Sequence, residues 1–301
     1  MGSKKDFPVM LAKEYDKDRI HSWKHIVVEP KLDGIRVLVR VDLDKESIKF
    51  FSRNGRELDM FRHLCEEVEK LAYGAAGKDE DFAEGCVIDG EMISATGEFG
   101  EIAGAIHRKE HTAEDARLLC FCIMPLSAFD RGEDYRSQRN RYSLLSRVIN
   151  KRNLELIIPT VAMEVASDEE VWTTVNAMKA QAIANNKVEG GMVKNYRLPW
   201  VAKRTHAWMK IKDHRTVDVV VTGVKEGTGK YQGTLGALVC KHKKVKIQVS
   251  GMTDEERNQF WKDREVIVGR MIEVEYQEVT VHGALRHPRF VRMRPDKEKA
   301  A

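Results

Sequence analysis

The sequence predicts an α+β protein of two domains, a larger one of antiparallel sheets with flanking helices and a small β-barrel after it. Its 301 residues are enough for two domains of ordinary size. Strand-like runs and amphipathic helical stretches alternate as far as Lys212. Beyond that residue the pattern changes to short strands separated by glycine and charged turns, so we place the boundary near Asp213, with domains at 1–213 and 214–301.

Residues 25–51 are expected to form paired strands. Asp33-Gly34 separates two runs rich in β-branched residues, a pattern that predicts a hairpin. A second turn at 42–46 leads into another strand.

Four elements are expected in the rest of the first domain. Apolar residues recur at helical spacing over 60–71, and 87–93 indicates a strand pair or one strand with a bulge. Residues 118–126 form an apolar run typical of a buried strand. A second helix is expected after Ser167, which has Glu170 three positions on and so resembles a capping box.

The second domain is expected to be an OB-type barrel, because five short strands with one helix before the fourth suit that fold. Thr253 and Glu256 form the capping box of the helix. The expected strands are 217–224, 236–240, 245–249, 271–279 and 290–293.

Composition and charge narrow the class of protein. No run of eighteen apolar residues occurs, so no membrane span is expected, and no apolar segment follows the first basic residues, so no secretory signal is expected. The five cysteines form no CxxC pair, which favours a reducing cytosol over a zinc site or a disulfide scaffold. The whole net charge of +4 arises after residue 215, and a basic module there suits a polyanionic partner or, equally, a solvated surface.

Lys31, in Glu29-Pro30-Lys31-Leu32-Asp33-Gly34, is the candidate nucleophile. A lysine attacks phosphorus only as the neutral amine, whereas its ordinary pKa is about 10.4. Nearby cations or a metal ion would lower that pKa. Taken alone, the segment is equally consistent with a solvated lysine beside a hairpin turn.

Further segments along the chain are similar to motifs of one family. The sequence resembles the covalent nucleotidyltransferases and, within them, the ATP-dependent DNA ligases, from Lys31 to Lys297. The segments that carry the resemblance are Lys31-Leu32-Asp33-Gly34, Ser52-Arg53-Asn54-Gly55, Asp89-Gly90-Glu91, Glu189-Gly190-Gly191-Met192-Val193-Lys194, Trp208-Met209-Lys210-Ile211-Lys212 and Arg294-Pro295-Asp296-Lys297. The resemblance implies a nucleotidyltransferase (adenylation) domain followed by an OB-fold domain.

The resemblance also implies how ATP would bind. Phe121 occupies the place of an aromatic residue that stacks on adenine, and Glu91 that of a glutamate that binds the ribose hydroxyls. Arg36 and Arg53 are the expected nucleotide- or phosphate-binding arginines. Glu29 suits the adenine amino group, because a carboxylate accepts hydrogen bonds and repels guanine O6.

The same resemblance implies which residues take part in the reaction. Lys31 would carry the adenylate, and Glu189 with Asp33 would serve Mg²⁺, for which Mn²⁺ is a possible substitute. Lys210 and Lys212 would meet the α-phosphate, since residues two apart on a strand share a face.

The second domain is expected to provide residues that bind both the nucleotide and the nucleic acid. Arg294 and Lys297 would meet the leaving pyrophosphate if this domain closes over the site. Lys241, Lys243, Lys244 and Lys246 would contact DNA phosphates. Arg108 and Lys109 are weaker candidates, more simply interpreted as solvated charges.

We therefore expect an ATP-dependent ligase that seals nicks in double-stranded DNA, a monomer in the cytoplasm of a bacterium or a phage-infected cell. Only thirty residues precede Lys31. We therefore expect the compact phage or minimal bacterial type, without a helical DNA-binding domain. The alternatives are an RNA ligase, an mRNA-capping guanylyltransferase and a nucleic-acid-binding module with an inactive transferase fold. The segment 285–292 resembles a DNA ligase ending, which favours DNA.

Overall fold

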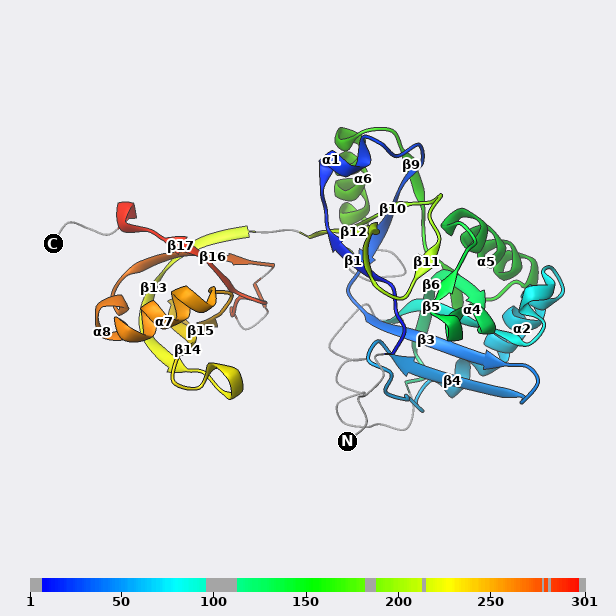
Figure 1. Ribbon diagram of the computed structural model, residues 1–301, viewed down its shortest axis with the longest axis horizontal. Coiled ribbons are helices and arrows are strands. Elements are labelled where there is room, and N and C mark those ends of the chain that lie inside the picture. Colours follow the sequence, from blue (N-terminus) through cyan, green and yellow to red (C-terminus); the bar gives the residue numbers. More distant parts are fainter. Residues whose placement is uncertain are drawn as a thin grey trace. The chain divides into compact units, whose positions relative to one another are not determined.

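The computed structural model describes residues 7–95, 113–181, 188–212, 215–277, 279–280 and 283–297. The chain divides into two compact units, Met1–Ile211 and Lys212–Ala301 (Figure 1). The division lies close to the expected boundary. Asp213, Arg108 and Lys109 lie outside the described residues.

The described residues of the first unit form two five-stranded sheets and one two-stranded ribbon. The first sheet has the order β1-β12-β10-β2-β9 and the second β4-β3-β5-β6-β8. The strands of the first sheet are β1 (Leu11–Glu14), β12 (Arg204–Lys212), β10 (Val188–Asn195), β2 (Ile26–Leu32) and β9 (Met163–Val165). Those of the second are β4 (Ser47–Ser52), β3 (Ile35–Asp42), β5 (Gly85–Ser94), β6 (Ala116–Pro125) and β8 (Ile157–Pro159). The ribbon pairs β7 (Glu133–Asp134) with β11 (Trp200–Val201).

Most of the pairings in these sheets are antiparallel, as expected, but two are parallel. They are β1 with β12 and β6 with β8. The parallel pairing of β6 with β8 follows from the order of the elements. A helical crossover separates the two strands, and such a crossover returns the chain in the same direction. The sheets are therefore mixed rather than purely antiparallel.

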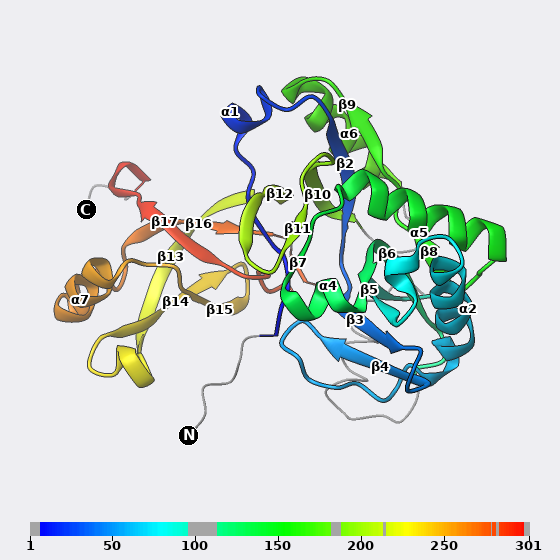
Figure 2. The ribbon, with the colours of Figure 1, turned by 45° about the vertical axis from the view of Figure 1, so that its right-hand side comes forward.

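Helices cover each sheet separately. Helices α2 and α5 pack together against the second sheet, and α6 packs against β10 and β2 of the first (Figure 2). Two apolar cores lie under these helices, one between α2, α5 and the second sheet and one beneath α6. A third core includes Phe129 of α4 and Trp200. The helices are α1 (Lys17–Ile20), α2 (Cys65–Ala76), α4 (Leu126–Arg131), α5 (Gln138–Arg152) and α6 (Asp168–Ala180). The short 3₁₀ turns of this unit are η1 (Arg62–Leu64) and η2 (Glu80–Phe82).

The expected hairpin at Asp33-Gly34 is wrong. Strand β2 belongs to the first sheet and β3 to the second, so this turn carries the chain from one sheet to the other. The glycine serves a close approach rather than a tight hairpin: a Cβ at Gly34 would lie 2.5 Å from the carbonyl oxygen of Met92. The next turn does join a hairpin, because β3 and β4 pair directly.

Other expected elements of this unit are confirmed. Strand β5 is a single strand whose register with β6 shifts between Asp89 and Gly90, which is the expected bulge. Ser167 caps α6, its side chain accepting from the backbone N–H of Glu170. The Glu170 carboxylate reaches the backbone N–H of Ala166, one residue before the cap.

The second unit has the expected five strands and a helix before the fourth. Its sheet has the order β15-β14-β13-β16-β17, and a parallel bridge between Ser250 and Arg289 brings its two edges together. Helix α7 begins with the expected capping box of Thr253 and Glu256. The elements are β13 (Arg215–Glu226), η3 (Gly229–Tyr231), β14 (Leu235–His242), β15 (Val245–Val249), α7 (Asp254–Lys262), α8 (Arg264–Ile267), β16 (Met271–Tyr276), β17 (Arg289–Met293) and η4 (Pro295–Lys297).

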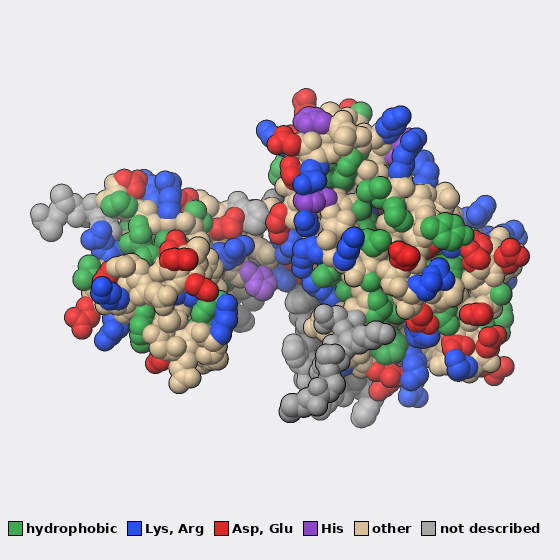
Figure 3. All heavy atoms as spheres, in the orientation of Figure 1, with side chains coloured by type: hydrophobic (Ala, Val, Ile, Leu, Met, Phe, Trp, Pro, Cys, Tyr) green, Lys and Arg blue, Asp and Glu red, His purple; other side chains and the backbone are tan. Residues whose placement is uncertain are grey.

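Charged side chains of both signs are interspersed over the face of the molecule drawn in Figure 3. No helix in the described part of the chain is long and apolar enough to cross a membrane.

Candidate active site

A cavity of about 720 Å³ opens in the first unit, where residues from both of its sheets meet. Most of the predicted nucleotide-binding residues line it, as do Gly34 of the turn after β2 and Asn54 of the turn after β4. The predicted residues that line the cavity are Glu29, Lys31, Arg36, Arg53, Glu91, Phe121 and Lys210. The fold therefore gathers, from five strands and one turn, groups that lie up to 181 positions apart.

Lys31 lies near the end of β2 and forms an ion pair with Glu189. Its Nζ lies 2.5 Å from the Glu189 Oε2, and the two side chains remain 22% and 15% exposed. The register of β10 with β2 shifts between Val188 and Gly190, so Glu189 is the extra residue of a β-bulge. A bulge turns a side chain away from the regular alternation, which explains how Glu189 reaches Lys31.

Glu29 lies two residues before Lys31 and forms a fully buried ion pair with Lys194. Here the carboxylate belongs to β2 and the ammonium to β10, the reverse of the Lys31–Glu189 pair. Lys194 Nζ donates to Glu29 Oε2 at 2.7 Å, and the Tyr196 hydroxyl donates to Glu29 Oε1 at 2.9 Å. Each carboxylate oxygen thus has a protein donor. Burial raises the pKa of Glu29, while Lys194 and then Tyr196 act to lower it.

Two aromatic rings lie beside this buried pair. Phe121 on β6 and Trp208 on β12 meet edge to face, with ring centroids 5.7 Å apart. The Lys194 ammonium lies 4.7 Å from the Phe121 centroid and 4.2 Å from that of Trp208. Gln138 Nε2 donates to the Phe121 carbonyl at 2.8 Å and so fixes β6 at this position.

Arg36 is held inside the protein by its own partners. Its Nε and Nη2 donate to the two oxygens of the buried Asp89, at 2.9 and 2.6 Å, and Nη1 donates to the carbonyl of Met10. Its guanidinium also lies 5.6 Å from the Phe121 centroid. Arg36 therefore offers the cavity a fixed positive charge rather than a mobile side chain.

Glu91, on β5, faces the same cavity as Lys31. Burial raises its pKa to about 7, with Lys31 and Arg36 acting to lower the value and Asp89 and Glu189 to raise it. Its carboxyl group therefore changes charge near neutral pH.

Cations line the rest of the cavity. Arg53 lies in the turn after β4, and its pKa is lowered by burial and by the positive charges of Arg36 and Arg204. Lys210 Nζ lies 2.8 Å from Glu14 Oε1 on β1. Lys212 ends the same strand but is not among the residues that line the cavity.

Asp33 lies in the crossing between the sheets and is half-buried, outside the cavity lining. Among the described residues, no three His, Cys, Asp or Glu side chains are clustered closely enough to hold a metal ion by themselves. Mg²⁺ commonly uses one or two carboxylates together with substrate phosphates and water. The partly exposed Glu189 carboxylate beside the cavity fits a site of that kind.

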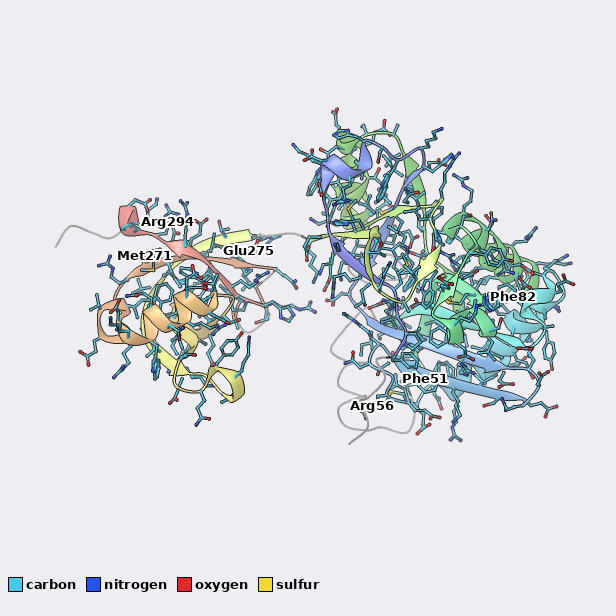
Figure 4. The ribbon with its side chains drawn as sticks, in the orientation of Figure 1. Phe51, Arg56, Phe82, Met271, Glu275 and Arg294 are labelled. Carbon is cyan, nitrogen blue, oxygen red and sulfur yellow. The ribbon has the colours of Figure 1, made fainter. Side chains whose placement is uncertain are left out.

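Arg294, labelled in Figure 4, follows β17. It forms ion pairs with acidic side chains of its own unit. Its Nη1 donates to Asp218 at 3.0 Å, its Nη2 donates to Asp296 at 2.8 Å, and Nη1 lies 3.6 Å from Glu273. Lys297, in η4, is exposed.

Comparison with known proteins identifies the family. Residues 9–212 match the profile of the ATP dependent DNA ligase domain, and residues 226–294 match the DNA ligase OB-like domain. The chain belongs to the ATP-dependent DNA ligase family. Both matched domains are ligase domains, so the predicted nucleotidyltransferase and OB folds are confirmed.

Individual ligases show how far the similarity extends. The chain is 27% identical to a DNA ligase of Halobacterium salinarum over 93% of its own length and 54% of that protein's. It is 24% identical to a DNA ligase of Haemophilus influenzae over 94% of its own length and 89% of that protein's. The solved structure of Pmar-Lig_PreS3 superposes with a TM-score of 0.79 at 29% identity, covering 96% of this chain and 68% of that one. The chain thus spans about half the length of the halobacterial ligases and most of the Haemophilus one.

Several residues around the ligase-family cavity were not predicted as site residues. Lys194 was quoted only as the end of a motif, and Tyr196 follows it at the spacing that places both on one side of a strand. Asp89, which holds Arg36, belongs to a quoted motif as well. Arg204, which lines the cavity and donates to the carbonyl of Ala12, gave no signal in the sequence.

Proposed function

We propose that this member of the family is an ATP-dependent DNA ligase that seals nicks through an adenylate on Lys31. The observation that carries the proposal is the position of the Lys31 amine. It lines the same cavity as an aromatic ring, Phe121, and a carboxyl group, Glu91, and it is paired with a carboxylate, Glu189, that is still in contact with solvent.

The proposed reaction has three phosphoryl-group steps. The neutral Lys31 amine attacks the α-phosphorus of ATP, a P–N bond forms, and the bond to pyrophosphate breaks. The 5′-phosphate at a nick then attacks the same phosphorus, which moves AMP onto the DNA and restores the lysine. Finally the 3′-hydroxyl attacks the DNA phosphate, a phosphodiester bond forms and AMP leaves.

The walls of the cavity suit adenosine. Phe121 and Trp208 provide apolar surface for the base, and the Glu91 carboxylate, when ionised, can accept hydrogen bonds from ribose hydroxyls. Glu29 lies among these residues and provides the acceptor for the adenine amino group.

The cations of the cavity suit the triphosphate. Arg53 and Lys210 line it with Arg36, and Lys212 lies two residues beyond Lys210 on the same strand. Fixed positive charges of this kind stabilise the negative charge that develops during phosphoryl transfer.

Mg²⁺, or Mn²⁺ in its place, is the proposed metal. Glu189 would be its main protein ligand and Asp33 a further oxygen donor. When bound, the ion would neutralise phosphate charge. Glu189 also accepts a hydrogen bond from the Lys31 ammonium. The same carboxylate would therefore contact both the nucleophile and the metal ion.

The second unit is proposed to bind duplex DNA and to provide Arg294 and Lys297 for pyrophosphate. Lys241, Lys243, Lys244 and Lys246 are all exposed on the β14–β15 hairpin. Lys241 and Lys246 face each other directly across the two strands. Like charges in that position oppose folding, and a bound phosphate would relieve the repulsion. If ATP draws this domain over the cavity, small-angle scattering should show compaction on adding ATP; an unchanged radius of gyration would contradict the closure.

The remaining proposals concern the whole protein. We take residues 1–213 as the adenylation domain and 214–301 as the OB-fold domain. The substrate is nicked double-stranded DNA, the active form is a monomer, and the location is the cytoplasm of a bacterium or a phage-infected cell.

The test is covalent labelling followed by sealing. Wild-type protein incubated with α-labelled ATP should retain label after denaturation, and it should seal a nicked duplex with ATP but not with GTP or NAD. Lys31→Ala should retain no label, whereas Lys49→Ala, a change at an exposed lysine of β4 paired with Glu57, should be labelled like wild type. Label on Lys31→Ala would contradict the assignment.

A further inference from the structure

Lys194 is a buried charge that the proposed reaction does not use. Its side chain is 2% exposed, as is that of its partner Glu29. Removing both charges from water is costly, and the cost is offset only when the pair is well hydrogen-bonded. The contacts of this ammonium therefore point to a particular task.

Three contacts of Lys194 define that task. Its Nζ donates to Glu29 at 2.7 Å and lies over the rings of Phe121 and Trp208. Lys194 and Met192 share one face of β10, and both line the cavity. A single ammonium thus fixes the carboxylate and the aromatic rings relative to one another.

We propose that Lys194 is the positioning residue that sets the base specificity of the nucleotide pocket, by keeping Glu29 ionised where it faces position 6 of the purine. This inference rests on the proposed adenylation of Lys31. An ionised carboxylate can only accept hydrogen bonds. It therefore favours a 6-amino purine such as adenine over a 6-carbonyl purine such as hypoxanthine.

The charge of Glu29 depends on Lys194 because its other hydrogen-bond donor, the Tyr196 hydroxyl, is neutral. Tyr196 donates one hydrogen bond to Glu29, and Tyr142 lies behind it with its ring centroid 5.9 Å from that of Tyr196. Without the ammonium, burial would favour a protonated Glu29 carboxyl. That carboxyl carries an O–H donor, which satisfies the carbonyl oxygen at position 6 and removes the basis of discrimination.

The experiment compares α-labelled ATP with α-labelled ITP as donors to Lys31. ITP differs from ATP only in the groups at positions 6 and 1 of the base, so the two donors isolate this contact. The measured quantity is kcat/KM for covalent labelling with each nucleotide, in wild type, Lys194→Met and Lys194→Arg. Lys45→Met, at an exposed lysine paired with Asp42, is the matched control.

In wild type, ATP should exceed ITP, and Lys194→Met should reduce the ATP-to-ITP ratio by about tenfold, the effect of roughly one hydrogen bond. Lys194→Arg keeps the charge and should retain most of the ratio, and Lys45→Met should leave it unchanged. If Lys194→Met does not fold, the double variant Glu29→Gln/Lys194→Met, which buries no charge, should show the same loss of ratio.

An ATP-to-ITP ratio equal to that of wild type in Lys194→Met, or in Glu29→Gln/Lys194→Met if the single variant does not fold, would overturn the inference. Absence of ATP labelling in wild-type protein would instead contradict the proposed function. The two failures are therefore distinguishable.

Discussion

Two ion pairs connect the same two neighbouring strands, β2 and β10, with opposite polarity. Near the end of β2 a lysine, Lys31, meets a glutamate of β10, Glu189, and both remain in contact with solvent. Two residues earlier a glutamate, Glu29, meets a lysine of β10, Lys194, and both are buried. The two pairs share sheet, strands and residue types but differ in exposure.

The difference in exposure assigns the two pairs to different tasks. Lys31 is partly exposed and lines the cavity, so it can meet a triphosphate that enters there, and its pair suits chemistry. The buried pair of Glu29 and Lys194, called the sealed pair below, cannot exchange partners without leaving a charge uncompensated. It therefore suits a fixed role, here the shape and hydrogen-bonding character of the base pocket.

The largest expected effect comes from breaking the sealed pair. Glu29→Ala leaves the Lys194 ammonium buried and unpaired, so the free energy of unfolding should fall by about 3–5 kcal/mol. Urea denaturation of the purified variant measures this loss. Glu29→Gln/Lys194→Met is the control, and it should recover most of the stability; an equal loss in both proteins would show that packing, not charge, is responsible.

Breaking the exposed pair should affect the reaction more than the fold. Glu189→Gln removes the charge beside Lys31, and the labelling rate with ATP should fall on the order of 100-fold. Stability should change by only about 1 kcal/mol, because both side chains of the pair are partly exposed. Single-turnover labelling and urea denaturation measure the two quantities, with Glu57→Gln as the surface control; a large loss of stability without a loss of rate would reverse the assignment of the two pairs.

The ring that lies over the sealed pair should act through nucleotide binding. Phe121→Ala removes a stacking surface, and base–aromatic stacking is worth about 1–3 kcal/mol. The KM for ATP should therefore rise roughly 5- to 150-fold while kcat falls less. Steady-state labelling at varied ATP measures both, and Phe121→Tyr should stay near wild type. A fall in kcat alone would exclude the stacking role.

Glu91 provides the most specific test, because its carboxyl group changes charge near neutral pH. Burial raises its pKa to about 7 from an ordinary value near 4.5, so the folded protein holds a proton there that the unfolded chain releases. The stabilisation is full below pH 4.5 and is lost as the pH rises through 7. Wild type should therefore lose stability relative to Glu91→Gln between pH 4.5 and 7, by less than about 1.4 kcal/mol per pH unit. Parallel pH profiles of the two proteins in urea would contradict the raised pKa.

Much of this architecture could be predicted from the sequence, because its signals are local. The N-cap Ser167 and the capping box at Thr253 predicted their helices, and the alternation of Lys210 and Lys212 with apolar residues predicted a strand. Most of the predicted nucleotide-binding residues line the cavity, whereas Asp33, Glu189 and Lys212 do not, and the individual roles of all of them stay predictions.

Long-range packing was not predictable in the same way. Asp33-Gly34 has the local signature of a hairpin, yet the glycine is needed for contact with Met92, which lies 58 positions away. The pairing of Glu29 with Lys194 likewise depends on β2 and β10 becoming neighbours across 165 positions. Nothing in either segment alone indicates that partner.

The central distinction between the two ion pairs is tested most directly by locating the adenylate. Wild-type protein, incubated with ATP and Mg²⁺ and then digested, should yield AMP on the peptide that contains Lys31, as mapped by tandem mass spectrometry. The buried Lys194 should remain unmodified. AMP on Lys194, Lys210 or any lysine other than Lys31 would contradict the assignment of the exposed pair to chemistry and the sealed pair to specificity.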